Sequence, residues 1–185
     1  MNFKGIINKN NMLSVLVALL MACSTKTSAL GTANLPAVEA VDFVDLERYA
    51  GTWYEIARFP FERQKDCVGT TATYELEADF VRVINRCYYK SFEGRMTTAT
   101  GRAKVKDKET NAKLRVSFFW PFYGDYWVIS LGENYDYAVV SMPSRKNLWI
   151  LYRDPVMPKD LYAEIVQDLR SRNFDTSRLI STLQK

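Results

Sequence analysis

The sequence contains no histidine, and this absence narrows the chemistry that the chain can perform. Histidine is the usual base of serine and cysteine hydrolases and the commonest metal ligand in proteins. Basic residues exceed acidic ones by only four, and no dense basic block occurs. The composition therefore favours neither an enzyme, nor a metal site, nor a nucleic-acid-binding protein, and we expect no cofactor.

A membrane-spanning run is also missing. The apolar stretch "MLSVLVALLMA" at 12–22 has eleven residues, too few to cross a hydrocarbon core of about 30 Å. It follows a segment in which Lys4 and Lys9 are the only charged residues. This order is typical of a secretory signal, so we expect residues 1–22 to be a signal peptide.

The signal ends at Leu20-Met21-Ala22-Cys23, which resembles the bacterial lipobox with Cys23 as the lipidated residue. Two or three lipid chains would anchor the protein stably, whereas a single chain binds membranes only weakly. Ser24 follows, where an aspartate tends to retain lipoproteins at the inner membrane, so we expect the outer membrane and its periplasmic side. Residues 23–40 lack periodicity and are expected to be a lipidated tether. An ordinary secretory signal, with Cys23 incidental, is the alternative.

Cysteines are scarce, with three in the chain. If Cys23 is lipidated, Cys67 and Cys87 remain in an exported protein, where thiols commonly pair. They flank a predicted hairpin at 71–85, so we expect a disulfide between them. Strand parity alone does not determine whether both sulfur atoms point the same way, and two unpaired buried cysteines are the alternative.

What the sequence does contain is a regular series of short β-type runs separated by turn residues. The runs lie at 52–59, 68–77, 80–89, 96–105, 112–119, 125–131, 136–142 and 147–153. Such spacing predicts an all-β sandwich or closed barrel. An apolar stripe from Leu161 to Leu169 predicts a helix that begins near Pro158, and 177–183 is a candidate final strand. We therefore expect one domain at 41–185.

Alternation along three of these runs selects the side chains that would face an interior. Leu114, Val116, Phe118 and Trp120 share a face, as do Trp53, Glu55, Ala57 and Phe59, and as do Trp149, Leu151 and Arg153. Glu55 and Arg153 are charged, and a buried charge without a partner is costly. Each therefore needs a specific partner or a cavity that water reaches.

Three stretches resemble the bacterial outer-membrane lipocalins, the group related to apolipoprotein D and the plant temperature-induced lipocalins. They are "GTWYEIARFP", with the Gly51-x-Trp53 signature, "RVSFFWPFYG" and "LWILYRDP". The resemblance covers about 41–183. The turn before the seventh run, at 132–137, departs from the Thr-Asp-Tyr element that is common in the family.

The resemblance implies an eight-stranded antiparallel up-and-down barrel, closed at one end, with a C-terminal helix on the outside. A barrel of this size holds one small ligand. Trp53 and Arg153 would then lie together at the closed end, and with Gly51 we interpret them as structural residues. The loops near 60–67, 90–95, 120–124 and 143–146 would surround the open end.

Seven of the eleven residues in "SFFWPFYGDYW", at 117–127, are aromatic, and this segment would supply the rim of the open end. Trp120, Phe122 and Tyr123 suit a membrane interface, since tryptophan and tyrosine prefer that region and basic residues attract anionic lipid. The basic residues of the same loops are Arg63, Lys65, Lys90, Arg95, Arg145 and Lys146. The alternative is that Trp120 and Phe122 pack into the barrel as a lid.

The function that this resemblance implies is storage or transport of a fatty acid or lysophospholipid. The expected ligand-binding residues are Glu55, Ala57, Phe59, Leu114, Val116, Phe118, Tyr126, Val128, Val139, Trp149 and Leu151. A structural or stress-related envelope lipoprotein with an incidental pocket is the alternative. Whether the protein forms a homodimer is left open.

Overall fold

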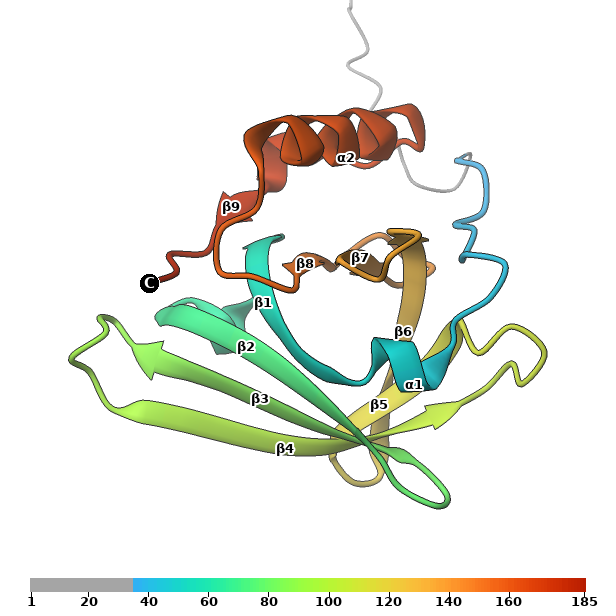
Figure 1. Ribbon diagram of the computed structural model, residues 1–185, viewed down its shortest axis with the longest axis horizontal. Helices are drawn as coiled ribbons and strands as arrows, with labels where there is room; N and C mark the ends of the chain where they lie inside the picture. Colours follow the sequence, from blue (N-terminus) through green and yellow to red (C-terminus); the bar gives the residue numbers. More distant parts are fainter. Residues whose placement is uncertain (1–34) are drawn as a thin grey trace, which may run out of the picture. The chain divides into compact units, whose positions relative to one another are not determined.

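The structure, a computed structural model, describes residues 35–185 and shows a closed antiparallel barrel with a helix on its outside (Figure 1). The strands are β1 (Gly51–Arg58), β2 (Cys67–Leu76), β3 (Val81–Tyr89), β4 (Met96–Val105), β5 (Lys113–Phe119), β6 (Phe122–Leu131), β7 (Tyr137–Ser141), β8 (Leu148–Tyr152) and β9 (Ile180–Ser181). The expected signal peptide and Cys23 lie outside the described residues. Residues 32–185 form one compact unit.

The strand order is sequential, β2 to β8, followed by β1 and β9. A second pairing, between β1 and β2, closes the sheet into a barrel. The eight long strands, the outer helix and the short final strand were all predicted from the sequence. The rim differs from the prediction, because β6 begins at Phe122 rather than at residue 125 and leaves only Trp120 and Pro121 as the loop.

The short helix α1 (Leu46–Tyr49) closes one end of the barrel. Asp45 caps it by accepting hydrogen bonds from the backbone N–H groups of Glu47 and Arg48. The other end is the mouth. Its four loops, the mouth loops, span residues 59–66, 90–95, 120–121 and 142–147.

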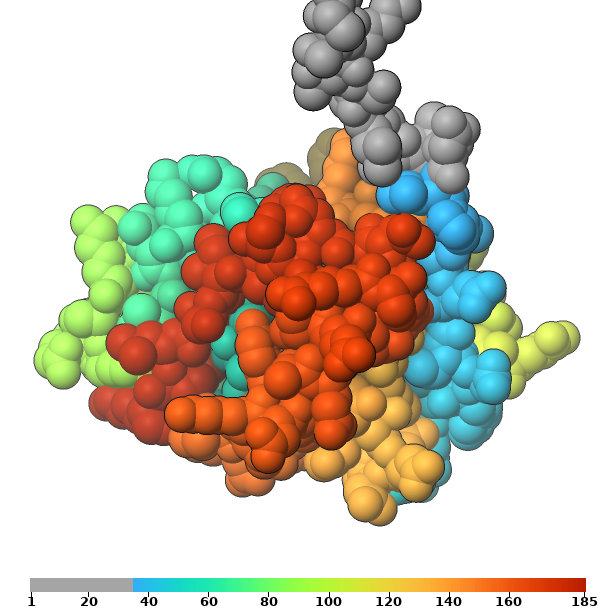
Figure 2. Space-filling view, turned by 90° about the horizontal axis from the view of Figure 1, so that it is seen from above, coloured from blue at the N-terminus to red at the C-terminus, as the bar shows by residue number. Residues whose placement is uncertain are grey.

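The long helix α2 (Lys159–Ser171) packs against the outside of the barrel (Figure 2). Ile165 and Leu169 are buried in a second core, the outer core, which also contains Ile150 of β8. Val38 belongs to the same core, and the backbone oxygen of Pro36 accepts a hydrogen bond of 2.8 Å from Arg145. The packed chain therefore starts before residue 41, where the sequence had placed the domain boundary. No helix within 35–185 has the length and apolar character needed to cross a membrane.

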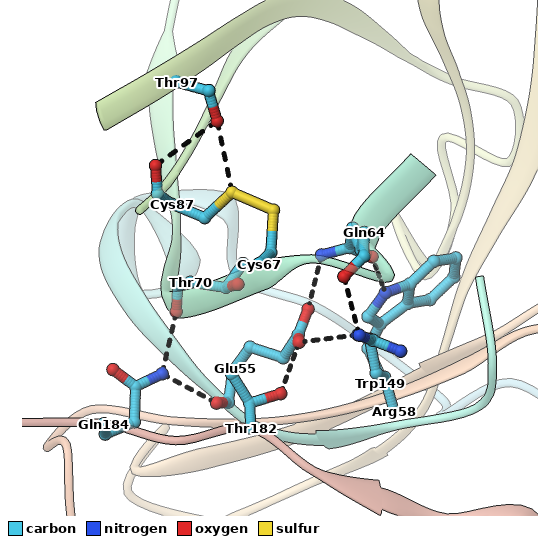
Figure 3. The surroundings of a disulfide bond; sticks show 10 residues. All are labelled: Glu55, Arg58, Gln64, Cys67, Thr70, Cys87, Thr97, Trp149, Thr182 and Gln184. Carbon is cyan, nitrogen blue, oxygen red and sulfur yellow. Dashed lines mark hydrogen bonds and ion pairs between the residues drawn. A yellow bond between two sulfur atoms is a disulfide. The ribbon is translucent and has the colours of Figure 1, made fainter. Parts of the chain in front are cut away.

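The segment at 180–184, which we call the strap, fills a gap in the barrel wall. The β1–β2 pairing ends at Tyr54 and Thr71. Beyond that point the strap pairs with β1, and the N–H of Gly69 in β2 donates to the Leu183 oxygen at 2.7 Å. The Gln184 amide donates across the gap, to the backbone oxygens of Glu55 at 2.8 Å and of Thr70 at 3.0 Å (Figure 3). The strap thus joins two strands that no longer pair with each other.

Cys67 and Cys87 form the expected disulfide, which links the mouth ends of β2 and β3. The bond closes a loop with a sequence separation of 20 residues. Such a cross-link lowers the entropy of the unfolded chain.

Replacing both cysteines with serine should lower the free energy of unfolding by about 3 kcal/mol, the loop-closure value for a cross-link of this span. Urea unfolding followed by circular dichroism measures the change. A reductant should destabilise the wild-type protein to a similar degree and leave the double-serine variant unaffected. An unchanged wild-type midpoint under reducing conditions would contradict the prediction.

Candidate functional site

Five side chains form a polar cluster in the mouth half of the barrel (Figure 3). The Glu55 carboxylate accepts hydrogen bonds from Gln64 Nε2 at 2.7 Å and Thr182 Oγ1 at 2.5 Å. Arg58 Nε lies 3.2 Å from the same carboxylate, and Trp149 Nε1 donates to Gln64 Oε1 at 3.0 Å. Glu55 is only 2% exposed and Arg58 5%. The cluster connects β1 to the β1–β2 loop, to β8 and to the strap.

Glu55 has its partners within the protein. Burial raises the pKa of Glu55 above its ordinary value, and the hydrogen bonds from Thr182 and Gln64 and the charge of Arg58 partly offset that effect. Because two hydrogen bonds and the ion pair with Arg58 satisfy the carboxylate, Glu55 does not need a ligand headgroup as a partner. The sequence alone did not identify the partner of Glu55.

Three tyrosines fill the half of the barrel near α1. The hydroxyl of Tyr126 lies 2.7 Å from the Tyr49 hydroxyl and 2.7 Å from the Tyr74 hydroxyl. Burial raises the pKa of Tyr74 to about 12 and the pKa values of the other two well above the ordinary value. The cavity beside these rings measures about 10 Å³, enough for about one water molecule. This half of the barrel is therefore packed with the protein's own side chains.

The inner wall formed by β3 and β4 is more open near the mouth. Asn85 and Ala99 are cross-strand partners on the inward face, and Ala99 is exposed. Asn85 Oδ1 is buried without a hydrogen-bond partner among the described residues. Phe118 lies across Gly101, where a Cβ atom would come within 2.8 Å of the Phe118 ring. Solvent thus reaches the interior on this side, and an unpaired acceptor lies in the wall.

Trp53 and Arg153 form the expected pair at the closed end. The Arg153 guanidinium carbon lies 3.8 Å from the Trp53 ring centroid, and Trp53 Nε1 donates to the backbone oxygen of Tyr49 at 2.8 Å. Arg153 also donates to the backbone oxygens of Arg48 at 2.7 Å and Thr52 at 3.1 Å. Arg153 therefore ties α1 to the start of β1. Gly51, at φ +93°, adopts a backbone conformation that favours glycine beside this guanidinium.

Most residues expected to line the interior lie there. They are Leu114, Val116, Tyr126, Val128, Trp149 and Leu151, together with Glu55 of the polar cluster. Phe118 is near the mouth and 38% exposed.

Ala57, Phe59 and Val139 were expected inside, and this was wrong, because they belong to the outer core under α2. In β1 a bulge at Ile56 shifts the register between Glu55 and Ala57, which moves the following side chains to the opposite face. Val139 was assigned to the wrong face of β7. Both faces of β7 are apolar, since α2 covers the outer one, and alternation then does not identify the inner face.

Sequence reasoning missed Arg58, Gln64, Thr182 and two of the three tyrosines. Arg58 points inward only because of the β1 bulge. Thr182 lies 127 residues from its partner Glu55, and no local pattern reveals a contact of that kind. The only available signal was that a buried Glu55 requires a nearby donor.

The rim residues are uncovered. Phe119, Trp120 and Phe122 are 72%, 80% and 73% exposed. Trp120 and Phe122 therefore do not form a lid over the barrel, and that alternative is wrong. Tyr123 is partly buried, with the Arg115 guanidinium carbon 5.5 Å from its ring centroid.

Residues 35–185 contain no group of three histidine, cysteine, aspartate or glutamate side chains that could hold a metal ion. The carboxylate of the polar cluster is neutralised by Arg58 instead.

Comparison with known proteins agrees with the barrel architecture. Residues 44–184 match the family described as a lipocalin-like domain. The chain belongs to the lipocalin family. This lipocalin is 39% identical over 163 residues to "Outer membrane lipoprotein Blc" of Escherichia coli (strain K12), with 88% of each chain covered. Relatives of that name also occur in Vibrio cholerae and Citrobacter freundii, which supports the outer-membrane location predicted from the sequence.

More distant relatives include plant and animal lipocalins. "Temperature-induced lipocalin-1" of Arabidopsis thaliana is 36% identical over 156 residues, covering 80% of this lipocalin and 83% of the relative. Among solved structures, insecticyanin of the tobacco hornworm Manduca sexta aligns with a TM-score of 0.67 at 23% identity, covering 82% of this lipocalin and 86% of that chain. This structural likeness shows the fold.

Proposed function

We propose that this lipocalin is anchored in the outer membrane by lipid on Cys23 and stores or transports a fatty acid or lysophospholipid. The acyl chain lies in the mouth half of the barrel, between Trp149 on one side and Ala99 and Phe118 on the other. The observation that carries the proposal is that Ala99 is exposed to solvent although it lies on the inward face of β4, opposite Asn85 of β3. Each buried methylene would contribute roughly 0.8 kcal/mol before ordering costs.

The ligand headgroup lies outside the polar cluster in this proposal. Glu55 and Tyr126 were the groups considered for orienting it, but both are engaged by neighbouring side chains. The mouth loops carry six basic residues and three acidic ones, which favours an anionic or zwitterionic headgroup. No catalytic step is included, because the chain has no histidine and Glu55 is held by two hydrogen bonds and an ion pair.

Replacing Ala99 with tryptophan should weaken fatty-acid binding at least tenfold, because the new ring would occupy the space assigned to the acyl chain. The measurement is a titration of residues 32–185 with oleate, followed by tryptophan fluorescence and thermal shift. Thr98→Trp is the matched control, since Thr98 is the adjacent exposed residue on the outer face of β4. Its affinity should stay within twofold of the wild-type value.

Two results would contradict the proposal. One is an Ala99→Trp variant that binds as well as the wild type, which would place the ligand elsewhere. The other is no saturable binding by the wild-type protein, which would favour the structural envelope lipoprotein.

A further inference from the structure

A groove of about 280 Å³ lies on the outside of the barrel beside the strap, and it is far larger than the cavity of about 10 Å³ beside the three buried tyrosines. Its floor is a row of cross-strand partners, in which Tyr54 of β1 pairs with Thr71 of β2 and Thr71 pairs with Arg86 of β3. Alternation places this row on the outer face, because the adjacent Trp53 and Ala72 belong to the core inside the barrel. The groove is therefore separate from the space assigned to the acyl chain.

One side of the groove is an aromatic wall at the β3–β4 hairpin. Tyr88 and Phe92 meet edge to face, with ring centroids 5.9 Å apart, and Met96 is the cross-strand partner of Tyr88. Phe92 packs on the backbone of Gly69, where a Cβ atom would come within 2.7 Å of the ring. Gly69 has φ +60°, which also favours glycine. The wall is thus preformed, and a ligand that binds there does not have to order it.

The strap forms another side of the groove. Its Gln184 amide is fixed by hydrogen bonds to the backbone oxygens of Glu55 and Thr70 (Figure 3). Lys185 follows, and its Nζ lies 4.9 Å from the ring centroid of Phe92. The strap therefore holds one flank of the groove in place and brings a cation to the aromatic wall.

The charge of the groove is positive. Its lining includes Arg86 and Lys185 and no acidic side chain. Arg86 is exposed, and no carboxylate of residues 35–185 lies within ion-pair distance of it, whereas Arg82 on the same face of β3 pairs with two carboxylates. Lys185 is less available, because its charge also acts on the carboxylate of Glu93. Arg86 is therefore the cation that can bind an anion in the groove.

We propose that this groove, the outer groove, is a second ligand site that takes a small aromatic carboxylate. The ring would lie against Tyr54 and the aromatic wall, since aromatic rings pack favourably in offset or edge-to-face arrangements. The carboxylate would pair with Arg86, whose planar guanidinium can donate two parallel hydrogen bonds to it. The volume of about 280 Å³ lies just below the range of about 300–1,000 Å³ for pockets that hold drug-sized ligands, which suits one or two rings. The site lies outside the barrel and does not depend on the proposed lipid ligand.

The first test measures binding of 2-naphthoate to residues 32–185 by equilibrium dialysis, with and without saturating oleate. We expect one saturable site that oleate does not displace. Arg86→Met should weaken this binding at least tenfold, because the carboxylate loses its partner. The matched control is Arg102→Met, which removes an exposed arginine on the outer face of β4 that is not part of the groove, and its affinity should stay within twofold of the wild-type value.

An uncharged probe separates ion pairing from a change in the shape of the groove. The carboxamide of the same naphthalene ring should bind the wild type at least fivefold more weakly than 2-naphthoate does, and Arg86→Met should leave its affinity within twofold. A loss of carboxamide binding equal to the loss of naphthoate binding would show that Arg86 does not hold the carboxylate.

A second pair of variants locates the ligand. Thr71→Trp fills the floor of the groove and should abolish the binding that oleate does not displace. Thr73→Trp places the same ring at the next outward position of β2, outside the groove, and should stay within twofold of the wild type.

Three results would overturn the proposal: no saturable binding of 2-naphthoate, complete displacement of 2-naphthoate by oleate, or equal affinities of the Arg86→Met and Arg102→Met variants. Titration with oleate alone tests the proposed lipid ligand, so the failure of one site is distinguishable from the failure of the other.

Discussion

Replacing Glu55 with methionine should lower the free energy of unfolding by about 3–5 kcal/mol, because the substitution leaves Arg58 buried without its carboxylate. Urea denaturation followed by circular dichroism measures the loss. Adding Arg58→Leu to the same chain should recover most of it, since a buried ion pair replaced as a whole by apolar groups is often close to neutral. The recovery distinguishes an unpaired charge from simple loss of packing.

The pair Glu62–Lys65 is the matched control. It has the same spacing in sequence, but its side chains are 82% and 62% exposed. Solvent screens such pairs, so Glu62→Met should cost no more than about 1 kcal/mol. Equal losses at Glu55 and Glu62 would show that the polar cluster contributes nothing beyond a surface ion pair.

The loss at position 55 should also depend on pH. Burial raises the pKa of Glu55 in the folded protein, so the folded state binds the proton more tightly than the unfolded state does. The wild-type protein therefore gains stability relative to Glu55→Met as the pH falls through the folded pKa toward the unfolded value. The difference between the two proteins should be larger at about pH 5 than at about pH 8.

Trp53→Ala should lower the free energy of unfolding by about 3–5 kcal/mol, the range for removing a large buried aromatic side chain. Trp53 is fully buried, stacks under Arg153 and contacts Tyr49, whose ring centroid lies 5.0 Å away. The substitution leaves a cavity and removes the surface on which Arg153 lies. Unfolding should be followed by far-ultraviolet circular dichroism, because the substitution removes a tryptophan and therefore changes the fluorescence signal.

Trp120→Ala provides the control, because it makes the same chemical change at the exposed tip of the β5–β6 hairpin. Its effect on stability should lie within about 0.5 kcal/mol of zero. A comparable loss at both positions would mean that Trp120 is packed against other parts of the protein.

The sequence predicted the fold well because strands with one solvent-facing side carry a clear alternation. In β5, Leu114 and Val116 were assigned correctly because Lys113 and Arg115 mark the opposite face. The prediction failed where α2 covers the barrel, since Val139 and Val140 are both buried and polarity no longer separates inside from outside. The prediction failed again at Ile56, where a bulge reverses which of the following β1 side chains face inward, and no local sequence signal reveals that bulge.

The candidate site was less predictable than the fold because it is built from distant segments. The polar cluster needs the strap, and the tyrosine triad joins α1, β2 and β6. The residues of each group lie far apart in the chain, so only the folded barrel brings them together. The rim, in contrast, is a single hairpin, and its aromatic content was visible in eleven consecutive residues.

The strap also has a consequence for biogenesis. One edge of β1 is sealed by a segment about 125 residues further along, so a nascent chain that has not yet been translated to residue 180 carries an open seam. Unpaired strand edges invite pairing with other chains. A chain that ends before residue 180 should therefore leave this edge of β1 open and associate with other chains more readily than the full-length protein does.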